Sequence, residues 1–101
     1  MILINVVLSC KPERETPFTQ LLLDTMDASL VESGCVDYRF SADLVKPGTF
    51  YLMELWGDEA ALLAHVRGDV FARFLAELPA VGGLVSSVAY KGELSPYQVP
   101  R

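Results

Sequence analysis

The chain has 101 residues, a length that fits a single domain. It carries 8 basic and 13 acidic residues, a formal net charge of −5, and no basic stripe, which argues against nucleic acid and anionic membranes as partners. Hydrophobic residues make up 51% of the chain and the mean hydropathy is +0.32, more apolar surface than a domain this small buries easily. The surplus predicts a second buried surface, most simply a homodimer interface.

The sequence also limits where the protein acts. No apolar run approaches the roughly 18–20 residues of a membrane-spanning helix, and MILINVVLSC lacks a basic leader and a small-residue cleavage site. We therefore expect a cytoplasmic protein. Cys10 and Cys35 are expected to be small buried side chains, and a chain with one histidine is not expected to hold a structural metal.

The first half of the chain predicts a strand, a helix and a hairpin. Residues 2–9 are almost all apolar, which is typical of a strand covered on both faces. Helical spacing follows, with Thr16 as the expected N-cap, Pro17 as the first helical residue and Gly34 as the stop. Residues 35–42 and 49–56 predict two strands joined by a turn at 43–48. A hairpin centred near Lys46 would place Tyr38 opposite Glu54, and Val36 opposite Trp56.

The second half predicts a helix, a strand and a tail. Asp58 is the expected N-cap, Gly68 the expected break where the apolar direction changes, and LPAVGG the end of the helix. Residues 84–92 form the last strand and 93–101 a polar tail. The order is βαββαβ, an α+β ferredoxin-like domain over residues 1–92, with an antiparallel sheet and two helices on one face. Because the other face would be bare, we expect two copies to pack sheet to sheet.

His65 is the first candidate for chemistry. It lies about 110° on a helical wheel from the mean direction of Leu62, Leu63 and Val66, on the flank of the expected buried stripe. It is therefore either an exposed helix residue or a base, because histidine exchanges protons near neutral pH.

Four further polar or aromatic residues carry similar alternatives. Asn5, inside ILINVVL, is a satisfied amide or edge residue, or an amide aimed into a pocket. Trp56 is a core residue or the wall of a site for a flat ligand. Tyr38 and Glu54 are a structural cross-strand pair or, in a cavity, an acid/base pair. Gly-rich phosphate loops and the nucleophile elbow of hydrolases are absent from the sequence.

Three stretches resemble the antibiotic biosynthesis monooxygenase domain, a dimeric α+β barrel family: SGCVDYRF, FYLMELWGDEAALLAHV and DVFARFLAEL. Family members often carry Gly-Cys-Leu-x-Tyr in the first stretch, and Glu-x-Trp with a histidine nine positions after the tryptophan in the second. Trp56 and His65 fit that spacing. A second histidine that commonly precedes the phenylalanine of the last stretch is replaced here by Val70. The resemblance covers about residues 1–92.

The resemblance implies a homodimer that uses molecular oxygen, without a metal or organic cofactor, to oxidise a small aromatic, quinol or polyketide-like substrate. Under it, the catalytic residues are His65 as base or anion partner, Asn5 as oxyanion donor and Trp56, and the substrate-binding residues are Tyr38, Glu54, Phe71 and Phe74. Three alternatives stay open. One is an isomerase using His65 and Glu54, and another is a non-catalytic ligand-binding barrel. The third is a haem-degrading oxygenase, which fits less well because Leu75 stands nearest to that group's haem-ligating histidine.

Overall fold

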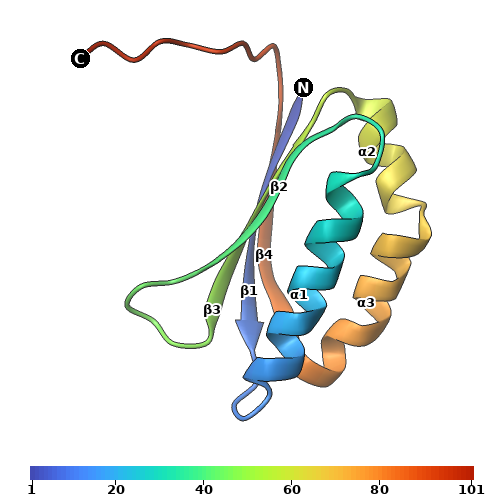
Figure 1. The fold of residues 1–101 in the computed structure, drawn as a ribbon, viewed down its shortest axis with the longest axis vertical. Helices are drawn as coiled ribbons and strands as arrows, with labels where there is room; N and C mark the ends of the chain where they lie inside the picture. The colour runs from blue at the N-terminus through green and yellow to red at the C-terminus, as the bar shows by residue number, and fades with distance from the viewer.

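The computed structural model describes all 101 residues. The chain forms two layers, a four-stranded antiparallel sheet and three helices that lie on one of its faces (Figure 1). The elements are β1 (Ile2–Cys10), α1 (Glu15–Leu30), β2 (Cys35–Ala42), β3 (Thr49–Trp56), α2 (Glu59–Val66), α3 (Asp69–Val81) and β4 (Gly82–Lys91). The strand order is β2-β3-β1-β4, so β2 and β4 are the edges. This arrangement confirms the predicted α+β ferredoxin-like fold. Residues 93–101 run away from the two layers as an extended tail (Figure 1).

The register of the β2–β3 hairpin decides which side chains face the helices. Tyr38 lies opposite Glu54, as predicted. A register shift between Cys35 and Asp37 places Cys35 opposite Trp56, so the predicted pairing of Val36 with Trp56 is wrong. Such an irregularity adds an unpaired residue to one strand and moves its neighbours by one position.

The start of α1 differs from the prediction. The helix begins at Glu15, and Arg14 precedes it without a side-chain capping bond, so Thr16 is not the N-cap. Pro17 is then the third helical residue rather than the first. It is tolerated there because the first four N–H groups of a helix have no partner within the helix.

The second helical segment follows the prediction at its start and at its break. The Asp58 carboxylate accepts a hydrogen bond from the Ala61 N–H at 2.8 Å and caps α2, and Gly68 separates α2 from α3. The predicted end of the helix within LPAVGG is confirmed, because α3 continues past Pro79 and ends at Val81, but β4 begins at Gly82 rather than at residue 84. Val81 is buried and its carbonyl accepts the Lys11 N–H at 2.8 Å, so packing holds this last turn.

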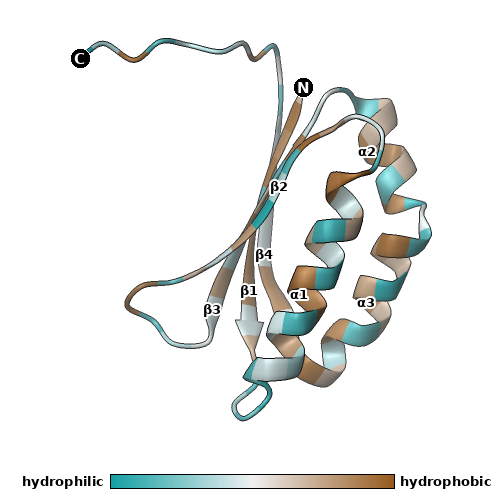
Figure 2. Ribbon diagram, viewed as in Figure 1, coloured by the Kyte–Doolittle hydropathy of each residue, from teal (hydrophilic) through white to brown (hydrophobic).

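The core lies between the sheet and the helices, while the other sheet face is uncovered. Even-numbered side chains of β1, such as Leu8, join Phe18, Leu22, Leu52 and Phe74 in the core. Odd-numbered β1 residues face the opposite way, and apolar neighbours on β3 and β4 share that bare face: Leu3, Val7, Met53, Val88 and Tyr90. Figure 2 shows hydrophobic colours along the strands as well as on the helices. None of the three helices is both long and apolar enough to cross a membrane.

Candidate functional site

His65 is the buried residue of α2. Its side chain is 1% exposed, whereas Leu63 and Val66, which the helical wheel placed toward the core, are each more than one-third exposed. The predicted orientation of α2 is therefore wrong. Ala61 lies one turn before His65 and packs closely on Gly34, where only a small side chain fits, and this contact turns His65 toward the sheet.

The two ring nitrogens of His65 have different surroundings. Nδ1 lies 2.8 Å from Oε1 of Glu32, in the short link between α1 and β2. Nε2 is buried and has no hydrogen-bond partner. Because an ionised carboxylate only accepts hydrogen bonds, Glu32 holds the proton of a neutral ring on Nδ1 and leaves the lone pair on Nε2. A buried acceptor without a partner costs stability, and such atoms are typical of functional sites.

Aromatic rings enclose this histidine. The ring of Trp56, which is fully buried, lies 4.6 Å from that of His65 at an interplanar angle of 34°. The ring of Phe71 lies 5.4 Å away, and that of Tyr38, 1% exposed, lies 5.7 Å away. Nε2 therefore faces an environment with little water, in which charge interacts strongly.

Two acidic groups next to the histidine have raised pKa values. The Trp56 indole N–H donates to Oε1 of Glu54 at 3.0 Å. Burial raises the pKa of Glu54, although the bond from Trp56 and the nearby His65 oppose the rise. Burial also raises the pKa of Tyr38, and the Glu54 carboxylate raises it further. The site therefore combines a proton acceptor, His65, with two acidic groups whose pKa values are raised.

The structure brings together five of the seven predicted site residues: Tyr38, Glu54, Trp56, His65 and Phe71. Phe74 is linked to these residues through Phe40. Its ring lies 6.3 Å from the ring of Phe40, which lies 5.7 Å from the ring of Tyr38. Asn5 does not join them. It is exposed on the bare sheet face, beside Met53 and Val88, because successive side chains of a strand point to opposite faces. The prediction that Asn5 shares a cavity with His65 is wrong.

Sequence reasoning missed Glu32. It stands 33 residues before His65, in a link that no hydrophobic period describes. The available signal was weak, an acidic residue two positions before Gly34, whose φ of +80° marks a tight turn.

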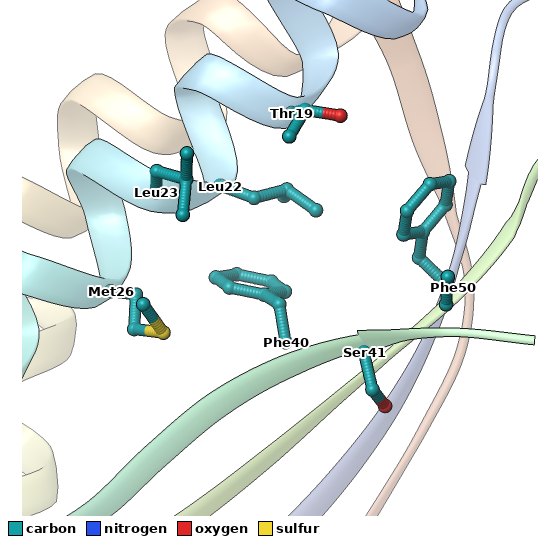
Figure 3. Close-up of a pocket in the computed structure, with 8 residues that line it drawn as sticks. Thr19, Leu22, Leu23, Met26, Phe40, Ser41 and Phe50 are labelled. Carbon is teal, nitrogen blue, oxygen red and sulfur yellow. The ribbon is translucent and has the colours of Figure 1, made fainter.

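An apolar hollow was also missed. It lies between α1 and the β2–β3 hairpin and has a volume of about 150 Å³ (Figure 3). Its lining is mostly hydrophobic: Thr19, Leu22, Leu23, Met26, Phe40, Ser41, Ala42 and Phe50. The hollow adjoins the histidine site through Phe40, whose ring lies 5.7 Å from that of Tyr38. By contrast, no three side chains among His, Cys, Asp and Glu gather where they could hold a metal ion.

Comparison with known proteins gives two curated relatives. An uncharacterised Synechocystis protein, sll1783, is 30% identical over 69 residues, which are 68% of this chain. The match spans about half, 47%, of that relative's length. YcnE of Bacillus subtilis, named as a candidate monooxygenase, is 29% identical over 77 residues, which cover 76% of this chain and 81% of YcnE.

Solved structures share the whole fold. The structure of a candidate antibiotic biosynthesis monooxygenase from Deinococcus radiodurans has a TM-score of 0.87 and 26% identity, covering 99% of this chain and all of that one. A variant of SnoaB, a cofactor-independent oxygenase from Streptomyces nogalater, has a TM-score of 0.80. That match covers 93% and 94% of the two chains, but at 12% identity it shows likeness of fold alone.

The antibiotic biosynthesis monooxygenase family model matches residues 1–77, about three-quarters of the chain. The match includes β1 to β3, α2 and the first part of α3, and so every residue of the His65 site. The chain therefore belongs to the antibiotic biosynthesis monooxygenase family.

Proposed function

We propose that this protein is a cofactor-independent monooxygenase that oxidises a small aromatic, quinol or polyketide-like substrate with molecular oxygen. The observation that carries the proposal is the buried imidazole of His65, which has a carboxylate on Nδ1, an unpartnered Nε2 and aromatic rings around it. Membership of the family and the similarity to YcnE, which is named as a candidate monooxygenase, support the same reaction class.

The chemistry begins with a proton transfer. Molecular oxygen reacts slowly with closed-shell organic molecules, but a resonance-stabilised carbanion can give it an electron. Nε2 of His65 takes a proton from an activated methylene group, and the Glu32 carboxylate stabilises the resulting imidazolium. The carbanion and oxygen combine to a peroxide, which takes up a proton and loses water. The net change, CH₂ + O₂ → C=O + H₂O, balances without an outside electron donor.

Tyr38 would assist the anionic intermediate. Its hydroxyl keeps its proton because burial raises its pKa, so it can donate a hydrogen bond to a developing oxyanion. Trp56 and Phe71 supply flat apolar walls next to His65.

A second candidate is an isomerase that moves a proton within its substrate. It is favoured by Glu54, a buried carboxyl with a raised pKa that is bonded to Trp56 beside His65. Such an enzyme needs only an acid/base pair and no oxygen. Turnover that continues under argon would select the isomerase over the oxygenase.

We also propose that two copies pair through the bare sheet face to form an α+β barrel. Apolar residues such as Val88 and Tyr90 are about half exposed there in the single chain. A contiguous apolar surface of this kind on a small domain is typical of an interface.

Oxygen uptake with a panel of anthrones and quinols tests the proposed function, with protein-free blanks because such compounds autoxidise. Uptake above the blank should fall about 100-fold or more in His65→Ala, the loss expected for a positioned general base. Glu32→Gln keeps the shape but removes the charge next to Nδ1, so it should lower turnover. Val31→Ala, at an exposed position near Glu32, is the matched control and should retain full activity.

Each of the other outcomes changes either the role of His65 or the assigned function. Unchanged uptake in His65→Ala would remove the histidine from the mechanism. Conversion without oxygen uptake would assign the isomerase, and binding without conversion would assign the ligand-binding barrel.

A further inference from the structure

We propose that the hollow between α1 and the β2–β3 hairpin binds one aromatic ring of a phenol- or quinol-type ligand, and that Phe40 separates this ring from the His65 site. That the bound ring then reacts at His65 rests on the proposed function. The binding of the ring and the separating role of Phe40 do not.

The size of the hollow sets the class of ligand. Its volume is about 150 Å³. An enclosed apolar cavity of about that size holds one benzene molecule, whereas sites for larger organic ligands typically measure roughly 300–1,000 Å³. One ring fits the hollow, and a fused three-ring compound does not fit while Phe40 keeps its position.

The walls favour an aromatic ring with one polar substituent. In Figure 3 the rings of Phe40 and Phe50 project from the hairpin toward α1, and Leu22 and Met26 approach from the helix. Aromatic walls favour stacked or edge-on contact with a ring. The Thr19 hydroxyl is the polar group on the helical side, since Ser41 points away from the hollow in Figure 3. A phenolic hydroxyl is the matching substituent.

Phe40 stands between this hollow and the histidine. Its ring lies 5.7 Å from that of Tyr38, which in turn lies 5.7 Å from the ring of His65. Tyr38, Trp56 and His65 are each at most 1% exposed, so the site is closed in this conformation. Phe40 is only half-buried and belongs to β2, an edge strand paired on one side, so fewer neighbours hold it than hold the buried rings of the site.

The single histidine makes the separating role of Phe40 directly measurable. Diethyl pyrocarbonate acylates an unprotonated imidazole nitrogen, and peptide mass spectrometry assigns the product to His65. Modification should be slow in the wild type and at least about tenfold faster in Phe40→Ala, because protection of a buried group is set by the local opening that exposes it. Phe50→Ala removes an equal ring from the opposite wall, where Phe50 packs on Phe18 at 4.9 Å, and should leave the rate near that of the wild type.

Ring binding is measured with p-cresol as the probe. It should shift the NMR signal of the Met26 methyl group in a saturable manner and should slow the modification of His65. Ala42→Phe, which fills the hollow from an exposed position, should abolish the shift while the protein stays folded, as reported by Trp56 fluorescence.

Equal rates of His65 modification in Phe40→Ala and Phe50→Ala would overturn the proposal. A Met26 signal that does not shift when p-cresol is added would also overturn it. The same holds if p-cresol does not slow the modification of His65. Neither measurement uses turnover. Ring binding and gating without oxygen uptake would therefore leave this inference standing and remove the oxygenase. Oxygen uptake without a shift of the Met26 signal would support the oxygenase and remove this inference.

Discussion

Glu54 shows how one buried side chain can link the stability of the protein to its chemistry. The carboxyl group lies beneath the helices, accepts a bond from Trp56 and has its pKa raised from the ordinary value of 4.5 by burial. The folded state therefore binds this proton more tightly than the unfolded state does. The stabilisation that follows is complete below about pH 4.5 and is lost as the pH rises through the folded-state pKa.

Glu54→Gln should remove that pH dependence, because the amide oxygen can still accept the Trp56 bond but does not titrate. The free energy of unfolding of the variant minus that of the wild type should rise as the pH increases above 4.5. Urea denaturation at a series of pH values, followed by the fluorescence of Trp56, measures this difference. Glu93→Gln, in the exposed tail, is the control and should give a difference that stays flat. A flat or falling difference for Glu54→Gln would contradict the assignment.

At the scale of elements, the link between α1 and β2 joins the two halves of the site. Gly34 has φ of +80°, and its carbonyl accepts the Gly57 N–H at 2.8 Å just before α2. A Cβ atom at position 34 would lie only 2.4 Å from Cβ of Ala61 on α2. This close approach holds the segment carrying Glu32 against the helix carrying His65.

Gly34→Ala should therefore cost more stability than Gly48→Ala. Both glycines have positive φ, +80° and +78°, so each substitution should lose about 1–2 kcal/mol from backbone strain. Only position 34 also meets a side chain, since a Cβ at position 48 has its nearest neighbour at 3.6 Å. The overpacking should add roughly 1–3 kcal/mol and should lower any His65-dependent turnover as well. Denaturation midpoints compare the two variants, and equal losses would show that the contact between the link and α2 does not matter.

For the whole molecule, the main feature is that the sheet has two unlike faces. The helices cover much of one face, while Val88 and its apolar neighbours on the other remain accessible to a second chain. The extended tail after β4 also leaves the body of its own chain (Figure 1). A sheet-to-sheet dimer would bury this apolar surface and account for a mean hydropathy that is high for 101 residues.

Light scattering at micromolar concentration should give a mass of roughly twice 11.1 kDa for the wild type. Val88→Lys should give a monomer, because an unpaired charge buried in an apolar interface is strongly unfavourable. Val31→Lys places the same charge at a site that is 84% exposed beyond the end of α1, and it should stay dimeric. A monomeric wild type, or a dimeric Val88→Lys, would exclude this interface.

Local patterns in the sequence determined most of the fold. Apolar periods of two or about 3.6 residues, together with the apolar run of residues 2–9, predicted the strands and helical segments in the right order. The capping carboxylate of Asp58, the break at Gly68 and the pairing of Tyr38 with Glu54 also followed from short-range chemistry and turn geometry. These features depend on neighbours within a few residues or across one hairpin, and such neighbours are visible in the sequence.

Only the tertiary structure decided how the candidate site is assembled. It turned His65 inward, placed Glu32 on its Nδ1 across 33 residues, and put Asn5 on the opposite sheet face. The physical reason is that the rotation of α2 and the bulge in β2 are set by contacts between distant segments, above all the fit of Ala61 on Gly34. A helical wheel gives the spacing of side chains around a helix, but packing against the rest of the chain selects the face that is buried.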